Sequence, residues 1–178
     1  MRLSAALALV FASALPGQSL QDTLRARIGD FPGTVSLYAR NLDTAESVGI
    51  RQAEPVRTAS TIKLPILLTV FDRVAAGKAR WTEPLTITPQ DKVSGSGVIG
   101  NELSDGVQLP LRDVVHLMIV LSDNSATNMI LERFTADAVN AYLDKIGIKT
   151  TRSLRKIRGD GTQLKAAEIG RASCRERV

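Results

Sequence analysis

The chain has 178 residues, of which 44% are hydrophobic and 23% charged, so it suits one globular domain with a sizeable core. Its formal net charge is +5, and aromatic residues make up only 4% of the sequence. Because charges of both signs are interspersed and no known nucleic-acid-binding module is present, the sequence argues against nucleic-acid binding.

The first residues have the layout of a secretory signal peptide. Residues 1–14, MRLSAALALVFASA, combine a basic start at Arg2 with an apolar stretch and an Ala-Ser-Ala end. The apolar stretch is too short to span a membrane, and no cysteine follows it as a lipid attachment point. We therefore expect a signal peptide within residues 1–19, cleaved between positions 14 and 19, and a periplasmic or secreted mature protein.

The next segments predict a helix and then a hairpin. Apolar side chains recur every three or four residues in residues 20–31, LQDTLRARIGDF, as on one face of a short helix that Gly33 then ends. Residues 34–42 alternate apolar and polar side chains, which predicts a strand. The segment SVGIR at 47–51 predicts its hairpin partner, across a turn formed by NLDTAE.

The rest of the chain is predicted to be mainly helical. A long apolar run that starts at Ser60 predicts a buried helix ending near Gly77, and LTITP at 85–89 predicts a short strand. The Gly- and Ser-rich residues 93–100 predict a loop. Three helices are expected after this loop: residues 109–121 with Pro110 in the first turn, residues 122–134 capped by Asn124 or Ser125, and residues 136–147 closed by Gly147.

The order of helix, hairpin and then helices indicates an α+β fold rather than alternating strands and helices. Two strands alone make a marginal sheet, so we expect C-terminal strands, missing from this chain, to complete it. Residues 168–178, EIGRASCRERV, resemble the translation of a sequencing adapter. The genuine domain is therefore expected to span residues 20–167 and to be incomplete, and Cys174, which lies in this tail, is assigned no role.

A hydroxyl and a cation stand at the start of the long apolar run, RTASTIKLPILLTVFDRVAAGK at 57–78. Residues three apart on a helix are neighbours, with Cβ atoms roughly 5–6 Å apart, so Ser60 and Lys63 are expected to face the same way. A serine becomes a nucleophile when a base takes its proton, and a buried lysine with a lowered pKa can be that base. The N–H groups at a helix start can also stabilise an oxyanion.

A structural alternative exists for this pair, in which Ser60 caps the helix and Lys63 extends its amine to water. By chance alone, about 0.5 copies of the pattern S-x-x-K are expected in a chain of this composition. A second copy runs from Ser153 to Lys156, within the charged segment RSLRKIR at 152–158, which is typical of a solvated loop.

A second motif, Ser122-Asp123-Asn124, lies between two predicted apolar helices. This tripeptide is expected only about 0.02 times by chance in a chain of this composition. In a tight link, residues 122 and 124 can point into one cleft while Asp123 turns inward to hold the loop. Ser122 is then a candidate to pass a proton to a leaving nitrogen, and Asn124 to hold a substrate amide and Lys63. Each residue taken singly could instead be a helix cap.

Together the S-x-x-K at 60–63, the S-D-N at 122–124 and GSGV at 95–98 resemble the class A serine β-lactamases and their penicillin-binding relatives, over about residues 20–165. The resemblance implies that Ser60 is the nucleophile acylated by the β-lactam carbonyl and Lys63 its proton acceptor or relay. It implies that Ser122 is the proton shuttle and Asn124 a contact for substrate and lysine. It also implies a monomer that hydrolyses small-molecule β-lactams, confers antibiotic resistance and uses no metal or other cofactor.

Two parts of the family's pattern are absent from the sequence. The third signature, K-T-G, does not occur, and KTT at 149–151 follows a different element. No glutamate lies in residues 150–161, where the deacylating acid is sought; Asp160 is the only acid there. We therefore expect little or no activity from the chain as it stands. The alternatives are a penicillin-binding D-Ala-D-Ala peptidase, and a non-catalytic exported fragment or pseudoenzyme.

Overall fold

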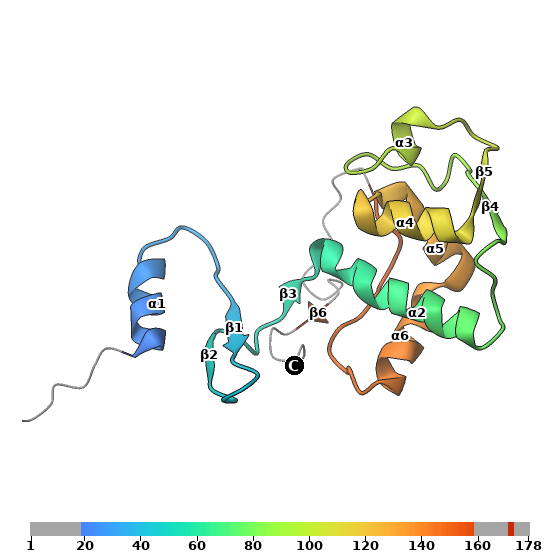
Figure 1. Cartoon of the computed structure of the whole chain (residues 1–178). Coiled ribbons are helices and arrows are strands. Elements are labelled where there is room, and N and C mark those ends of the chain that lie inside the picture. The colour runs from blue at the N-terminus through green and yellow to red at the C-terminus, as the bar shows by residue number, and fades with distance from the viewer. Residues whose placement is uncertain (1–18, 159–170, 173–178) are drawn as a thin grey trace, which may run out of the picture. The chain divides into compact units, whose positions relative to one another are not determined.

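The computed structural model describes residues 19–158 and 171–172 (Figure 1). Residues 1–18 and most of the 168–178 tail lie outside the described residues, and with them the expected signal peptide and adapter-derived end. The chain divides into two compact units at the boundary between Arg51 and Gln52. Each unit combines helix with short antiparallel strand pairs, so the predicted α+β class is confirmed.

The first unit contains one helix and the predicted hairpin. Helix α1 spans Leu20–Ile28 and ends at Gly29, whose φ of +44° suits a residue without a Cβ. Strands β1 (Leu37–Arg40) and β2 (Ser47–Ile50) pair antiparallel in full register. The helix and the hairpin therefore form where the spacing of apolar residues predicts them, but α1 ends at Ile28, before the Gly33 that was expected to end it.

The second unit is mainly helical. A 3₁₀ turn, η1 (Ala59–Ile62), runs directly into the first of its helices, which are α2 (Lys63–Ala75), α3 (Ile99–Glu102), α4 (Leu111–Val120), α5 (Asn124–Phe134) and α6 (Ala136–Lys145). Its strands form two short antiparallel pairs, β3 (Val56–Arg57) with β6 (Arg171–Ala172) and β4 (Pro84–Thr86) with β5 (Gln108–Pro110).

The core of the second unit lies among α2, α4, α5 and α6, which pack together in Figure 1. Each helix turns one apolar stripe inward, as the 3.6-residue period requires. The fully buried apolar side chains of these helices include Ile66, Val70, Leu111, Val114, Met118, Ile130, Val139 and Leu143. This packing holds the start of α2 beside the corner between α4 and α5.

Helix α2 is less buried than its composition predicts. Ile66 and Val70 are at most 1% exposed, whereas Leu64, Leu68 and Phe71 are 56%, 44% and 52% exposed. The expectation that the whole apolar run is buried is therefore wrong. Only the side of α2 that faces α4, α5 and α6 is covered within the described residues.

Two helix starts also differ from their predictions. Helix α5 is capped by Asp123, whose Oδ1 accepts from the N–H of Ala126 at 2.9 Å, and not by Asn124 or Ser125. Pro110 precedes α4 rather than lying in its first turn, because residues 108–110 form strand β5. Sequence patterns place the start of a helix only to within a residue or two, so the neighbouring Asp123 can be the cap in place of Asn124.

The segments between the helices follow the predictions in part. Residues 93–98 form the expected loop, but Ile99 already begins the short helix α3. Residues 152–158 lack regular structure, as expected for a loop, yet Ser153 is only 3% exposed, so the segment is not simply solvated. Within residues 19–158 and 171–172, no helix is both long and apolar enough to cross a membrane.

Candidate active site

The first half of the candidate site is the turn that leads into α2. Ser60 lies in η1, and Lys63 is the first residue of α2. A 3₁₀ turn has three residues per turn, so side chains three positions apart lie almost in line, as Ser60 and Lys63 do. Ser60 is exposed, whereas Lys63 is only 3% exposed. The turn therefore presents a hydroxyl to solvent beside a buried amine.

The second half is the corner between α4 and α5. Asp123 is fully buried there, and its Oδ2 accepts from the N–H groups of Val98 (2.7 Å) and Ile99 (2.9 Å). Its Oδ1 accepts from Ala126 within α5. The structure thus confirms that Asp123 turns inward and holds the neighbouring loop, while Ser122 and Asn124 remain half-buried on either side.

The glycines of the GSGV segment let this loop approach the corner. A Cβ at Gly97, whose φ is +119°, would lie 2.2 Å from Cγ of Asp123. A Cβ at Gly95 would lie 2.7 Å from Nδ2 of Asn124. Residues with a side chain do not fit at either position without moving the corner. The loop is further tied by the N–H of Asn124, which donates to Ser96 O at 2.9 Å.

The structure brings the four predicted site residues together. The Nζ of Lys63 donates to Oγ of Ser122 and to Oδ1 of Asn124, each at 3.0 Å, and to the carbonyl oxygen of Ser122 at 2.5 Å. The Oγ of Ser122 in turn donates to Oγ of Ser60 at 3.0 Å. A hydrogen-bonded path therefore runs from the amine of Lys63 through Ser122 to the hydroxyl of Ser60. The alternative in which Lys63 extends to water does not hold.

The surroundings of Lys63 favour its neutral form. Burial lowers the pKa of the Lys63 amine from its ordinary value, and the carboxylate of Asp123 opposes that effect by favouring the charged form. Because burial is the larger cause, the pKa remains lowered. A larger fraction of the amine is then neutral at a given pH, and only the neutral amine can accept a proton.

Backbone strain occurs on both sides of the site. Ala59, directly before Ser60, has a φ of +43°, and Ser122 has a φ of +53°. The left-handed region costs roughly 1–2 kcal/mol for a residue with a side chain. Such strain persists only where the surrounding contacts enforce it, and it clusters at functional sites. Ala59 adjoins Ser60, and Ser122 contributes its own hydroxyl to the path.

Replacing Ser122 with glycine is expected to destabilise the protein less than replacing it with alanine. Both changes remove Oγ, but only glycine relieves the left-handed backbone at this position. We expect Ser122→Gly to have a free energy of unfolding about 1 kcal/mol larger than Ser122→Ala, measured by urea denaturation. Equal stability of the two variants would show that the corner is not strained at residue 122.

Other chemically active residues of the chain lie apart from this site or outside the described residues. His116 is exposed on the surface of α4, and Cys174 is outside the described residues. No group of three or more His, Cys, Asp or Glu side chains gathers as a metal site in residues 19–158 and 171–172. The candidate site thus consists of an exposed serine hydroxyl, a second hydroxyl and a buried amine that are joined by hydrogen bonds.

Comparison with known proteins bears on this arrangement. A sequence model of the β-lactamase enzyme family matches residues 19–176. A β-lactamase from Sphaerobacter thermophilus DSM 20745 is 30% identical, with a TM-score of 0.73 over 86% of this chain and 56% of its own. A mutant of PBP-A, solved as an acyl-enzyme complex with penicillin G, is 29% identical, with a TM-score of 0.76 over 91% of this chain and 61% of its own.

A curated relative is the β-lactamase regulatory protein BlaB of Streptomyces cacaoi, 26% identical over 119 residues, which are 66% of this chain and 38% of that protein. The chain thus spans 38% of the length of this curated relative and 56% to 61% of the two solved structures. The family resemblance carried by S-x-x-K and S-D-N is confirmed by the sequence match over residues 19–176 and by the shared fold. The chain belongs to the β-lactamase enzyme family.

Proposed function

We propose that Ser60 is the nucleophile of an acyl-serine enzyme that opens and hydrolyses β-lactam rings. The observation that carries the proposal is the path from Nζ of Lys63 through Oγ of Ser122 to Oγ of Ser60, with both steps at 3.0 Å. Such a path supplies the base that a serine hydroxyl needs to become nucleophilic. Family membership supports the same chemistry.

The reaction follows from reversing the direction of the hydrogen bonds in this path. With Lys63 neutral, Ser60 O–H donates to Ser122, and Ser122 O–H donates to Nζ. As Oγ of Ser60 attacks the ring carbonyl, its proton moves along the path and Lys63 becomes an ammonium. The ring C–N bond then breaks, and Ser122 passes its proton to the leaving nitrogen and takes another from Lys63. Water finally cleaves the ester and regenerates Ser60.

Asn124 is proposed to hold the substrate as well as the lysine. Its Oδ1 accepts from Nζ of Lys63, while its Nδ2 donates to Ser94 O at a long 3.4 Å. The amide therefore stands between the proton path and the loop that the GSGV glycines shape. Its half-buried position leaves it accessible to an amide group on the substrate.

We propose that turnover belongs to a longer protein, of which this chain is the N-terminal part. The chain spans 56% of the 30%-identical β-lactamase and lacks a K-T-G sequence, which in the family contributes to the oxyanion site. Loss of one oxyanion donor costs roughly 10²–10³ in turnover. The 178-residue chain itself is therefore expected to show little or no turnover. We further propose export to the periplasm or medium, a monomeric state and a role in β-lactam resistance.

A second candidate function is a penicillin-binding D-Ala-D-Ala peptidase. Residues 150–158 contain no Asp or Glu, so this segment offers no carboxylate to activate a deacylating water. The PBP-A mutant, 29% identical, is known as an acyl-enzyme with penicillin G. An enzyme of this kind would become acylated on Ser60 by penicillin and stay acylated.

Mass spectrometry after exposure to penicillin G tests both candidates in the product of the uninterrupted gene. We expect one adduct on Ser60, abolished in Ser60→Ala. The matched control is Ser153→Ala, which alters the serine of the second S-x-x-K and should keep the adduct. No adduct would refute both functions. Turnover of a chromogenic cephalosporin would identify a hydrolase, and a single stoichiometric bleach would identify the peptidase.

A further inference from the structure

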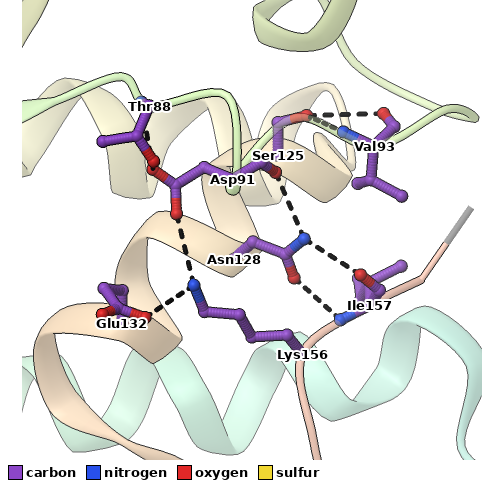
Figure 2. A network of polar contacts seen from close by, with 8 residues as sticks. All are labelled: Thr88, Asp91, Val93, Ser125, Asn128, Glu132, Lys156 and Ile157. Carbon is purple, nitrogen blue, oxygen red and sulfur yellow. Dashed lines mark hydrogen bonds and ion pairs between the residues drawn. The ribbon is translucent and has the colours of Figure 1, made fainter.

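Lys156, the lysine of the second S-x-x-K, is anchored in the fold. Its Nζ lies 2.6 Å from Oε2 of Glu132 and 3.4 Å from Oδ1 of Asp91, and Figure 2 shows it between these two carboxylates. Burial alone would lower the pKa of Lys156, but the hydrogen bond to Glu132 and the charge of Asp91 raise it above its ordinary value. The side chain is therefore charged at neutral pH.

The two carboxylates differ in what they contribute. The Asp91 side chain is 4% exposed, whereas that of Glu132 is 71% exposed. A charge pair in solvent contributes little, but removing one partner of a buried pair leaves the other uncompensated. Besides Lys156, the Asp91 carboxylate binds Thr88, whose N–H and Oγ1 donate to its Oδ2 at 3.1 and 2.6 Å. We therefore expect the contact of Lys156 with Asp91 to contribute more to stability than its contact with Glu132.

Asp91 also begins the loop that ends at the S-D-N corner. Its carbonyl oxygen accepts from Nδ2 of Asn128 at 3.2 Å, and two residues later Val93 N–H donates to Oγ of Ser125 at 3.0 Å (Figure 2). Both partners lie on α5, on the turns that follow Asn124. The loop then reaches the corner, where its N–H groups bind Asp123. Hydrogen bonds to α5 and to Asp123 therefore hold residues 91, 93, 98 and 99, which lie between the Lys156 contact and the candidate site.

The same helix fixes the backbone next to Lys156. Asn128 donates through Nδ2 to the carbonyl oxygen of Ile157 at 3.0 Å and accepts through Oδ1 from its N–H at 2.7 Å (Figure 2). Asn140 holds Ser153 in the same two-bond manner, at 2.8 Å for each bond. Because these clamps hold the main chain of residues 153–157 at two points, the Lys156 stem starts from a fixed position.

We propose that Lys156 is a positioning residue for the active site: through Asp91 it fixes loop 91–99, and through this loop the Ser122–Asn124 corner. The proposal rests on the proposed function only in taking that corner as the active site. Lys156 itself touches no reacting atom. If the loop shifted, the hydrogen bonds from Val98 and Ile99 to Asp123 would break. Asp123 would then no longer hold the corner, and the contact between Lys63 and Ser122 would be affected.

Hydrogen exchange of the 178-residue chain, read by mass spectrometry, tests the coupling without any assay of activity. We expect Lys156→Met to speed exchange about tenfold in peptides that cover residues 93–99, whose amides otherwise bind Ser125 and Asp123. Lys156→Arg should restore slow exchange, because a guanidinium can still reach Asp91. Glu132→Gln should change little, since that partner is exposed. Lys145→Met, which removes an exposed ion pair with Asp72, is the matched control.

The outcomes separate this proposal from the proposed function. Faster exchange in residues 152–157 alone, with residues 93–99 unchanged, would overturn the proposal, and so would equal effects of Lys156→Met and Lys156→Arg. In the uninterrupted gene product, the rate of Ser60 acylation should fall with Lys156→Met and recover with Lys156→Arg. If the wild type forms no adduct but residues 93–99 respond as expected, the proposed function fails while the coupling stands.

Discussion

Replacing Lys63 with methionine is expected to slow acylation of Ser60 by penicillin G by roughly 10²–10⁴-fold, the usual contribution of a positioned general base. Methionine matches the length of the lysine stem but cannot accept a proton, so the path through Ser122 ends without a base. In the wild type, the acylation rate should rise with pH through the lowered pKa of Lys63. In Lys63→Met this dependence should disappear. Timed mass spectrometry of the longer protein proposed above measures both effects.

Replacing Lys63 should affect stability in the opposite sense to acylation. Because the pKa of Lys63 is lowered in the folded state, the unfolded chain binds more protons in the window between the two pKa values, and stability increases with pH there. Below that window the charged amine costs stability. Lys63→Met should therefore be as stable as the wild type or more so at neutral pH, by urea denaturation. A large loss of stability would mean that Lys63 is structural. As a control for the acylation measurement, Lys145→Met, which removes an exposed ion pair with Asp72, should leave the acylation rate unchanged.

Replacing Asp123 with alanine is expected to produce the largest loss of stability in the second unit. The change leaves the N–H groups of Val98, Ile99 and Ala126 without their carboxylate acceptor, and both Ile99 and Ala126 are fully buried. Removing one partner from such a buried charged network costs about 3–5 kcal/mol. Urea denaturation measures the loss. The control is Asp113→Ala, which removes a half-exposed carboxylate paired with Arg112 at 3.5 Å and should have little effect.

The milder substitution Asp123→Asn separates charge from shape. The charge of Asp123 raises the pKa of Lys63, so its removal should lower that pKa further. Lys63 would then be neutral at lower pH, and the acid limb of the acylation profile should move to lower pH. A profile that stays in place, in a variant that still folds, would contradict the electrostatic link between Asp123 and Lys63.

Much of the candidate site could be predicted from the sequence because its parts are local. Ser60 and Lys63 are three residues apart, and Ser122, Asp123 and Asn124 are consecutive, so the chemistry of each half is visible in a few letters. The inward turn of Asp123 followed from its place between two outward-facing residues. The contact of Asn124 with Lys63 is a hypothesis from side-chain chemistry that the family resemblance supports, since no local pattern indicates that Lys63 reaches Ser122 and Asn124.

The parts that could not be predicted depend on contacts that are distant in sequence. Asp91 and Asn128 belong to no motif, and their role appears only when α5, the loop and residues 153–157 pack together. The exposure of Leu64, Leu68 and Phe71 depends on which side of α2 faces a neighbour. Strand β5 is not predicted from the sequence because its three residues are too few to show an alternating pattern.

The hydroxyl contact between Ser60 and Ser122 joins residues 62 positions apart, whereas the turn before α2 and the corner before α5 are each formed by near neighbours. Closing so long a loop is entropically unfavourable, so the contact should form after the folding transition state. Weakening it should accelerate unfolding and leave the folding rate unchanged. In a chevron plot only the unfolding limb should move; a shift of the folding limb would place the site in the nucleus. The same residues that assemble last would then govern how long the folded protein lasts.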